Sequence, residues 1–158
     1  MGEPFGLVPS IGNRGARRRT DQNAPMDHSD STPLAFDALV ALARAGGGAG
    51  CPACAALVCP GWEAVPGSFA RDALERVGTL RDPAIDDPTV AEYHPAGTHA
   101  WSADAPIAPA WFPYNRCDAW RCTSCARAFL RYTEHGGYYT EERIRELDAR
   151  LIVDVPLV

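Results

Sequence analysis

The six cysteines of this chain form two clusters with mirrored spacing, C-x2-C-x4-C followed by C-x4-C-x2-C. They are Cys51, Cys54, Cys59, Cys117, Cys122 and Cys125. A C-x2-C turn places two sulfurs on one side of a metal ion, and two such turns complete the tetrahedral shell that structural zinc prefers. The spacing therefore predicts one Zn²⁺ bound by Cys51, Cys54, Cys122 and Cys125.

The two C-x2-C pairs resemble the knuckles of zinc ribbons. The first pair, in Cys51-Pro52-Ala53-Cys54, keeps the proline of that motif, whereas Ala55 and Ala126 stand where glycine is usual. Between the pairs lie 67 residues, against roughly 15 to 20 in the compact form. The resemblance implies a metal site with a helix and a hairpin inserted between the knuckles, and it implies no reaction.

Cys59 and Cys117 leave three interpretations open. As ordinary buried thiols they would leave a plain zinc site. As a thiol–disulfide pair they would make a redox enzyme. As further ligands they would favour an iron–sulfur cluster, because C-x4-C-x2-C is the spacing of plant-type ferredoxins. Zinc is favoured over iron. In ferredoxins the fourth cysteine ligand follows the C-x4-C-x2-C motif, whereas no cysteine follows Cys125 here. Structural disulfides are the alternative in an oxidising compartment.

His94 and His99 are a second set of candidate metal ligands. They flank a predicted hairpin turn, and together with Asp104 or Glu92 they would imitate a catalytic zinc site with three protein ligands. The chain has no H-E-x-x-H motif, so half-exposed strand histidines are the favoured interpretation.

Arginines and aromatic residues alternate around the second cysteine cluster, and they are candidates for a binding surface. The candidate residues are Arg116, Trp120, Arg121, Arg127, Arg131 and Tyr132. Such a surface suits a phosphate, an RNA or an acidic peptide. Ion pairing of these arginines with acids of the same chain is favoured, because mixed surface charge is ordinary.

Motifs for nucleophilic catalysis or nucleotide binding are missing. The sequence contains no G-x-S-x-G, no G-x-x-x-x-G-K-[ST] and no lysine, which argues against hydrolases and phosphate-loop enzymes. The leading hypothesis is a non-enzymatic, zinc-stabilised interaction protein whose partner is another protein. The alternatives are a thiol-redox or metal-dependent enzyme that uses Cys59 and Cys117 or His94 and His99, and an iron–sulfur electron-transfer protein.

Charge is unevenly distributed along the 158 residues, which carry a formal net charge of −5. Four arginines lie in the first 25 residues, whereas the remainder is acidic, so nucleic acid is a less favoured partner. No apolar run is long enough to span a bilayer, and the cysteine pattern favours a reducing cytoplasm. Residues 1–30 are predicted to be a disordered extension, with Met26 as an alternative start.

Residues 31–158 are predicted to form a single small α+β domain. Helices are expected from Thr32 to the glycines at Gly46, from Ser68 to Val77, and from Thr140 through Leu151. Two short strands, over residues 89–94 and 98–102, are expected to form a hairpin, and a further strand is expected over residues 126–133. The stretch from Phe112 to Tyr139 also resembles small uncharacterised bacterial proteins, a resemblance that implies no activity.

Overall fold

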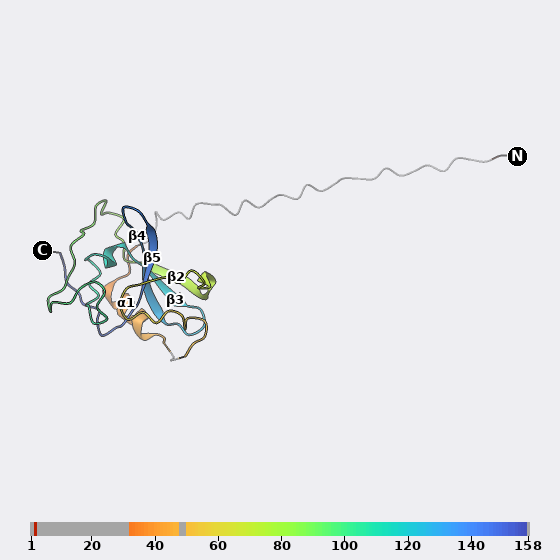
Figure 1. Ribbon diagram of the computed structural model, residues 1–158, viewed down its shortest axis with the longest axis horizontal. Helices are drawn as coiled ribbons and strands as arrows, with labels where there is room; N and C mark the ends of the chain where they lie inside the picture. The colour runs from red at the N-terminus through yellow and green to blue at the C-terminus, as the bar shows by residue number, and fades with distance from the viewer. Residues whose placement is uncertain (1, 3–31, 48–49, 158) are drawn as a thin grey trace.

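The computed structural model, which describes residues 2, 32–47 and 50–157, contains one antiparallel sheet of five strands (Figure 1). The strand order is β1-β5-β4-β3-β2. The strands are β1 (Glu63–Ala64), β2 (Leu74–Thr79), β3 (Asp118–Cys122), β4 (Ala128–His135) and β5 (Thr140–Glu146). One α-helix, α1 (Phe36–Arg44), and two short 3₁₀-helices, η1 (Arg71–Ala73) and η2 (Tyr114–Arg116), complete the described elements.

The predicted α+β class is wrong, because the described part of the chain is mostly this antiparallel sheet and has a single α-helix. Helix α1 is present where the first helix is expected, but it begins at Phe36 after Ala35 and not after a Thr32 cap. The predicted strand near residues 126–133 is present as β4. The turn after His135 joins β4 to β5 as a hairpin.

The predicted C-terminal helix is also wrong, because Thr140–Glu146 is strand β5. Seven residue pairs join β5 to β4, from His135 opposite Thr140 to Phe129 opposite Glu146. Ile144 and Leu147 fit a helical stripe, but pairing with the buried neighbouring strand β4 outweighs this local pattern.

The helix predicted from Ser68 to Val77 is replaced by η1 and the edge strand β2. Leu74 lies opposite Cys122 in the register of β2 and β3, so Cys122 is built into the sheet. The predicted hairpin over residues 89–94 and 98–102 contains no strand in this described stretch. A turn closed by the Gly97 amide and the His94 carbonyl, 3.1 Å apart, is present there.

Each face of the sheet carries its own hydrophobic cluster. The face that we call the core face packs against α1 and the loops, with Leu39, Leu130 and Tyr132 buried in the larger cluster. The opposite face, which we call the metal face, carries Cys122 and Phe129 in the second cluster. Side chains alternate between faces along a strand, so β3 and β4 contribute to both clusters.

The predicted extension over residues 1–30 and the alternative start at Met26 lie outside the described residues, apart from Gly2. The assignment of residues 31–158 to one domain stays a prediction. None of the described helices is long and apolar enough to cross a membrane.

Candidate metal centre

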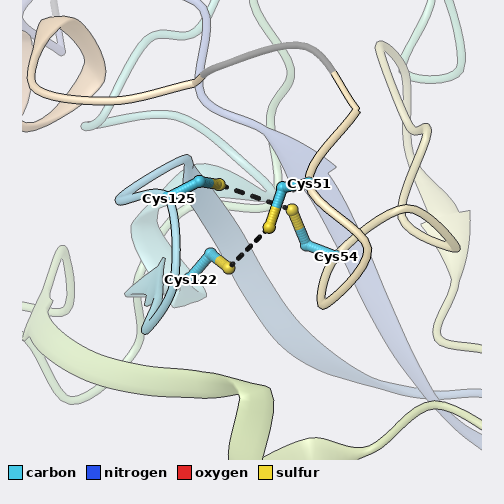
Figure 2. Close-up of side chains that lie close together, drawn as sticks. All are labelled: Cys51, Cys54, Cys122 and Cys125. Carbon is cyan, nitrogen blue, oxygen red and sulfur yellow. Dashed lines mark hydrogen bonds between the residues drawn. The ribbon is translucent and has the colours of Figure 1, made fainter.

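Four cysteine sulfurs converge at one point on the metal face, and all lie within 4.8 Å of one another. They belong to Cys51, Cys54, Cys122 and Cys125. Figure 2 shows two close approaches between the pairs, from Cys51 to Cys122 at 3.9 Å and from Cys54 to Cys125 at 3.6 Å. Four thiols in this arrangement can hold a metal ion.

The second cysteine pair is placed by the turn between β3 and β4. Cys122 ends β3, where its amide donates to the Arg127 carbonyl at 2.9 Å, and the Ala126 amide donates to the Cys122 carbonyl at 3.0 Å. Ala126 has a φ of +60°, a left-handed conformation that favours glycine. This turn directs both sulfurs to the same side of the backbone.

The first pair lies in the loop between α1 and β1, and it is held by the loop itself and by the sheet. The Leu57 amide donates to the Cys54 carbonyl at 3.0 Å, and Leu57 is buried against the metal face beside Phe129 and Ile144. Cys54 and Cys122 are almost completely buried, whereas Cys51 and Cys125 are partly exposed. The cluster therefore lies at the border between the second hydrophobic cluster and solvent.

The thiols of the cluster influence one another. Burial tends to raise the pKa of Cys51, but hydrogen bonds from the backbone amides of Cys54 and Ala53 lower it to about 7. Burial raises the pKa of Cys54, and the neighbouring thiols raise it further. Cys125 also has a raised pKa, mainly through burial, although a hydrogen bond from the Arg127 amide opposes this. Binding of a metal ion would displace the remaining protons, because the ligands are thiolates.

Cys59 and Cys117 are not part of the cluster. Cys59 lies in the hydrophobic cluster of the metal face and Cys117 in that of the core face. Each thiol donates to a backbone carbonyl, Cys59 to Leu57 at 3.5 Å and Cys117 to Pro113 at 3.3 Å. Burial raises the pKa of Cys59 to about 12 and that of Cys117 well above its usual range. Such thiols are poor nucleophiles.

The two histidines do not belong to a group of three or more candidate ligands in the described part of the chain. The Nδ1 atom of His94 lies 3.0 Å from the Thr98 hydroxyl, and its Nε2 atom lies 2.7 Å from a Glu92 carboxylate oxygen. His99 is exposed in the same loop. Both ring nitrogens of His94 are thus engaged within its own loop.

The residues of the predicted binding surface are divided between different environments. Tyr132 is buried on the core face, and Arg116 donates to the Pro88 carbonyl at 3.1 Å. Arg131 is on the metal face, where its guanidinium lies over the Trp120 ring.

Three arginines of this set form ion pairs with acids of the sheet. Arg121 pairs with Glu75, Arg127 with Glu146 and Arg131 with Glu142. The pairing favours the interpretation of mixed surface charge, and binding through this set stays a prediction.

No motif in the sequence points to Arg71, Arg76 and Arg81, which share two carboxylates on the metal face. Arg71 and Arg76 were expected on a helix, and no spacing in the sequence relates them to Asp118 or Glu142. An assignment of residues 74–79 to a strand would have placed Arg76 beside β3.

The four clustered cysteines are consistent with a zinc-ribbon-like motif that can bind a metal ion. Comparison of the chain with protein-family models, with curated proteins and with solved structures gives no match. Function must therefore be inferred from the chemistry of the chain's own residues.

Proposed function

We propose that this chain is a non-enzymatic binding protein stabilised by one Zn²⁺, with Cys51, Cys54, Cys122 and Cys125 as the four ligands. The observation that carries the proposal is the spacing of the sulfurs. In a tetrahedral site with zinc–sulfur bonds of about 2.3 Å, neighbouring sulfurs lie about 3.8 Å apart. The approaches of 3.6 Å and 3.9 Å between the two pairs agree with this value.

The spacing also favours a single ion over an iron–sulfur cluster. In a [2Fe–2S] or [4Fe–4S] cluster the thiolates are divided among two or four irons, so the four sulfurs must surround the whole cluster. Sulfurs that all lie within 4.8 Å of one another are too close together for that arrangement. Iron–sulfur electron transfer is therefore the less favoured alternative.

The proposed role of the zinc is structural. Four thiolates fill a tetrahedral shell and leave no position for water or substrate, which is the pattern of structural sites. Zinc would supply a redox-inert cross-link between the loop after α1 and the β3–β4 turn. Closing the loop of 67 residues between the two cysteine pairs is entropically unfavourable. The binding energy of the metal offsets this entropic cost.

The proposal also includes a binding function, with a protein as the partner, in a reducing compartment. This part of the proposal rests on residues outside the four-cysteine cluster. All six cysteines are unpaired thiols, which suits a reducing cytoplasm. The high pKa values of Cys59 and Cys117 argue against thiol chemistry.

The test is metal analysis of the full chain, purified anaerobically without a histidine tag. We expect one zinc per chain and a colourless protein. Replacement of zinc by Co²⁺ should give the intense visible bands of a tetrahedral cobalt thiolate. Cys54→Ser should lose the metal, whereas the matched variant Cys59→Ala should keep it. A brown protein that contains iron and sulfide, or equal metal content in both variants, would contradict the proposal.

A further inference from the structure

Each of the two clustered cysteine pairs has one member at the surface and one in the interior. Cys51 and Cys125 are partly exposed, whereas Cys54 is 0 % and Cys122 is 1 % exposed. A small oxidant in solution can therefore reach one sulfur of either pair in the folded chain. Zinc itself is redox-inert, but a thiolate is the form of cysteine that oxidants attack.

Each partly exposed cysteine lies close to the buried cysteine of the other pair. The Sγ atom of Cys51 is 3.9 Å from that of Cys122, and the Sγ atom of Cys125 is 3.6 Å from that of Cys54 (Figure 2). These sulfurs must come closer by about 2 Å or less to reach the disulfide bond length of about 2.05 Å. The geometry therefore favours disulfides that join the two pairs.

The other two cysteines are kept away from this chemistry. Cys59 and Cys117 are buried, and each donates to a backbone carbonyl. They belong to hydrophobic clusters on opposite faces of the sheet, so they cannot pair with each other. Neither belongs to the group of four converging sulfurs. Oxidation of the folded chain is therefore confined to the four clustered cysteines.

The surroundings of the buried sulfurs suit a neutral state. Cys54 and Cys122 lie in one hydrophobic cluster with Leu57, Phe129 and Ile144. A zinc ion with four thiolates has a negative net charge, whereas disulfides are neutral. Burial of charge among apolar side chains is unfavourable, so this environment does not oppose conversion of the thiolates to disulfides.

Disulfides between the pairs would also preserve the fold. They would close the same loop of 67 residues that the zinc ion is proposed to close. A cross-link over a loop of this length stabilises the folded chain, mainly because it restricts the unfolded chain. The loop after α1 would therefore stay attached to the β3–β4 turn after loss of the metal.

We propose that the four-cysteine centre is a redox switch, in which a hydroperoxide converts the four thiolates into the disulfides Cys51–Cys122 and Cys54–Cys125 and zinc is released. The inference rests on the proposed function, because it takes the four thiolates as the zinc ligands. In a reducing compartment, disulfides are mostly transient and serve catalysis or redox sensing. The switch therefore alternates between a zinc-bound reduced state and a metal-free oxidised state of the same fold.

Each disulfide forms in two steps. The thiolate of the exposed cysteine attacks one oxygen of hydrogen peroxide, so the O–O bond breaks, a sulfenic acid forms and hydroxide leaves. The thiolate of the buried partner then attacks the sulfenic sulfur, so the S–S bond forms and a second hydroxide leaves. The two thiolates lose two electrons, peroxide gains them, and two protons from solvent convert the hydroxides to water. Both disulfides together consume two molecules of peroxide.

The test treats the zinc-loaded full chain with hydrogen peroxide. We expect release of one zinc per chain, measured with a metallochromic indicator, and a fall from six thiols to two. Dithiothreitol and zinc should restore the starting state. The oxidised chain should keep its circular dichroism spectrum and should melt at a higher temperature than the reduced chain after chelation. Retention of all six thiols, or unfolding on oxidation, would overturn the proposal.

Tryptic digestion identifies the pairing, because the chain has no lysine and the two cysteine pairs lie in different peptides. Cleavage after arginine gives residues 45–71, with Cys51 and Cys54, and residues 122–127, with Cys122 and Cys125. The proposed disulfides link these two peptides, and fragmentation of the linked product should show Cys51 joined to Cys122. Two separate peptides, which disulfides within each pair would give, or the opposite pairing would contradict the proposal.

Cys59→Ala is the matched control, since it removes a thiol outside the cluster. It should release its zinc as the parent does, and a variant that resists peroxide would show that Cys59 takes part in the oxidation and would refute the assignment. Absence of zinc from the untreated chain would contradict the proposed function. The peptide map of the oxidised chain does not require the metal, so it still decides whether the two disulfides form.

Discussion

Gly46, just after α1, lies directly against Ala126 in the turn of the second cysteine pair. A Cβ atom at Gly46 would come within 2.2 Å of both the carbonyl carbon and the carbonyl oxygen of Ala126. The amide of the next residue, Gly47, donates to the Cys125 carbonyl at 3.2 Å. The end of the helix is therefore packed on the turn that carries two of the proposed ligands.

Gly46→Ala should destabilise the protein by about 2 kcal/mol or more, because the added methyl group meets backbone atoms that cannot rotate away. Urea unfolding of the zinc-loaded protein measures this change. Gly67→Ala is the matched control, since nothing lies within 4 Å of a Cβ built there. Equal stability of the two variants would show that the helix end does not contact the turn.

Ala126→Gly should stabilise the protein by up to about 1 kcal/mol, because glycine adopts a left-handed conformation without the Cβ repulsion that alanine suffers. Ala55→Gly, at the corresponding place after the first pair, is the control. Ala55 does not have a positive φ in the described chain, so glycine there should be neutral or destabilising. The difference in melting temperature between the two variants is the measurement. A lower melting temperature for Ala126→Gly would contradict the turn geometry.

Cys122→Ser should leave the protein unfolded or aggregated, because the proposed zinc loses a ligand and the loop after α1 loses its cross-link to the sheet. A chelator should have the same effect on the parent protein. Circular dichroism and metal content, measured together, check both expectations. Cys117→Ala is the control that should keep its metal. An unchanged melting temperature for Cys122→Ser would refute a structural role of the site.

Cys59 should resist thiol reagents in the folded, zinc-loaded protein. A pKa of about 12 means that about one molecule in ten thousand carries the thiolate at pH 8. The folded pKa is raised, so the thiolate fraction grows only as the pH approaches 12. Ellman's reagent should therefore react slowly with the native protein and with all six cysteines after denaturation and chelation. Two fast-reacting thiols in the native protein would instead favour redox chemistry at Cys59 and Cys117.

Arg145→Ala should destabilise the protein by about 3 kcal/mol or more, since it leaves buried acceptors unpaired and opens a cavity. Arg145 is fully buried, and it donates to the Tyr114 hydroxyl and to the carbonyls of Ala103 and Ala105. Arg150→Ala, at an exposed position, should change the stability little. Chemical denaturation of both variants is the measurement, and a neutral Arg145→Ala would show that the loop around residue 104 does not depend on this side chain.

Local sequence was sufficient for features that depend on near neighbours. The C-x2-C spacing selects the four clustered cysteines, because two residues between ligands already place both sulfurs on one side of the backbone. The apolar spacing around Leu39 predicts α1, and the glycines after His135 predict a turn at the end of β4, although not the strand that follows it. Each of these features is decided within a few residues of chain.

Tertiary structure decided the secondary structure of segments that their local sequence pattern alone does not settle. Thr140–Glu146 fits a helical stripe together with Leu147, but pairing with β4 selected the strand. Residues 74–79 became an edge strand because β3 offered a partner, which also brought Arg76 to Asp118. The meeting of Cys51 with Cys122, the sharing of Asp118 by two arginines and the burial of Arg145 all join residues far apart in the chain. No local pattern encodes such contacts, because their free energy comes from groups that meet only after the sheet has formed.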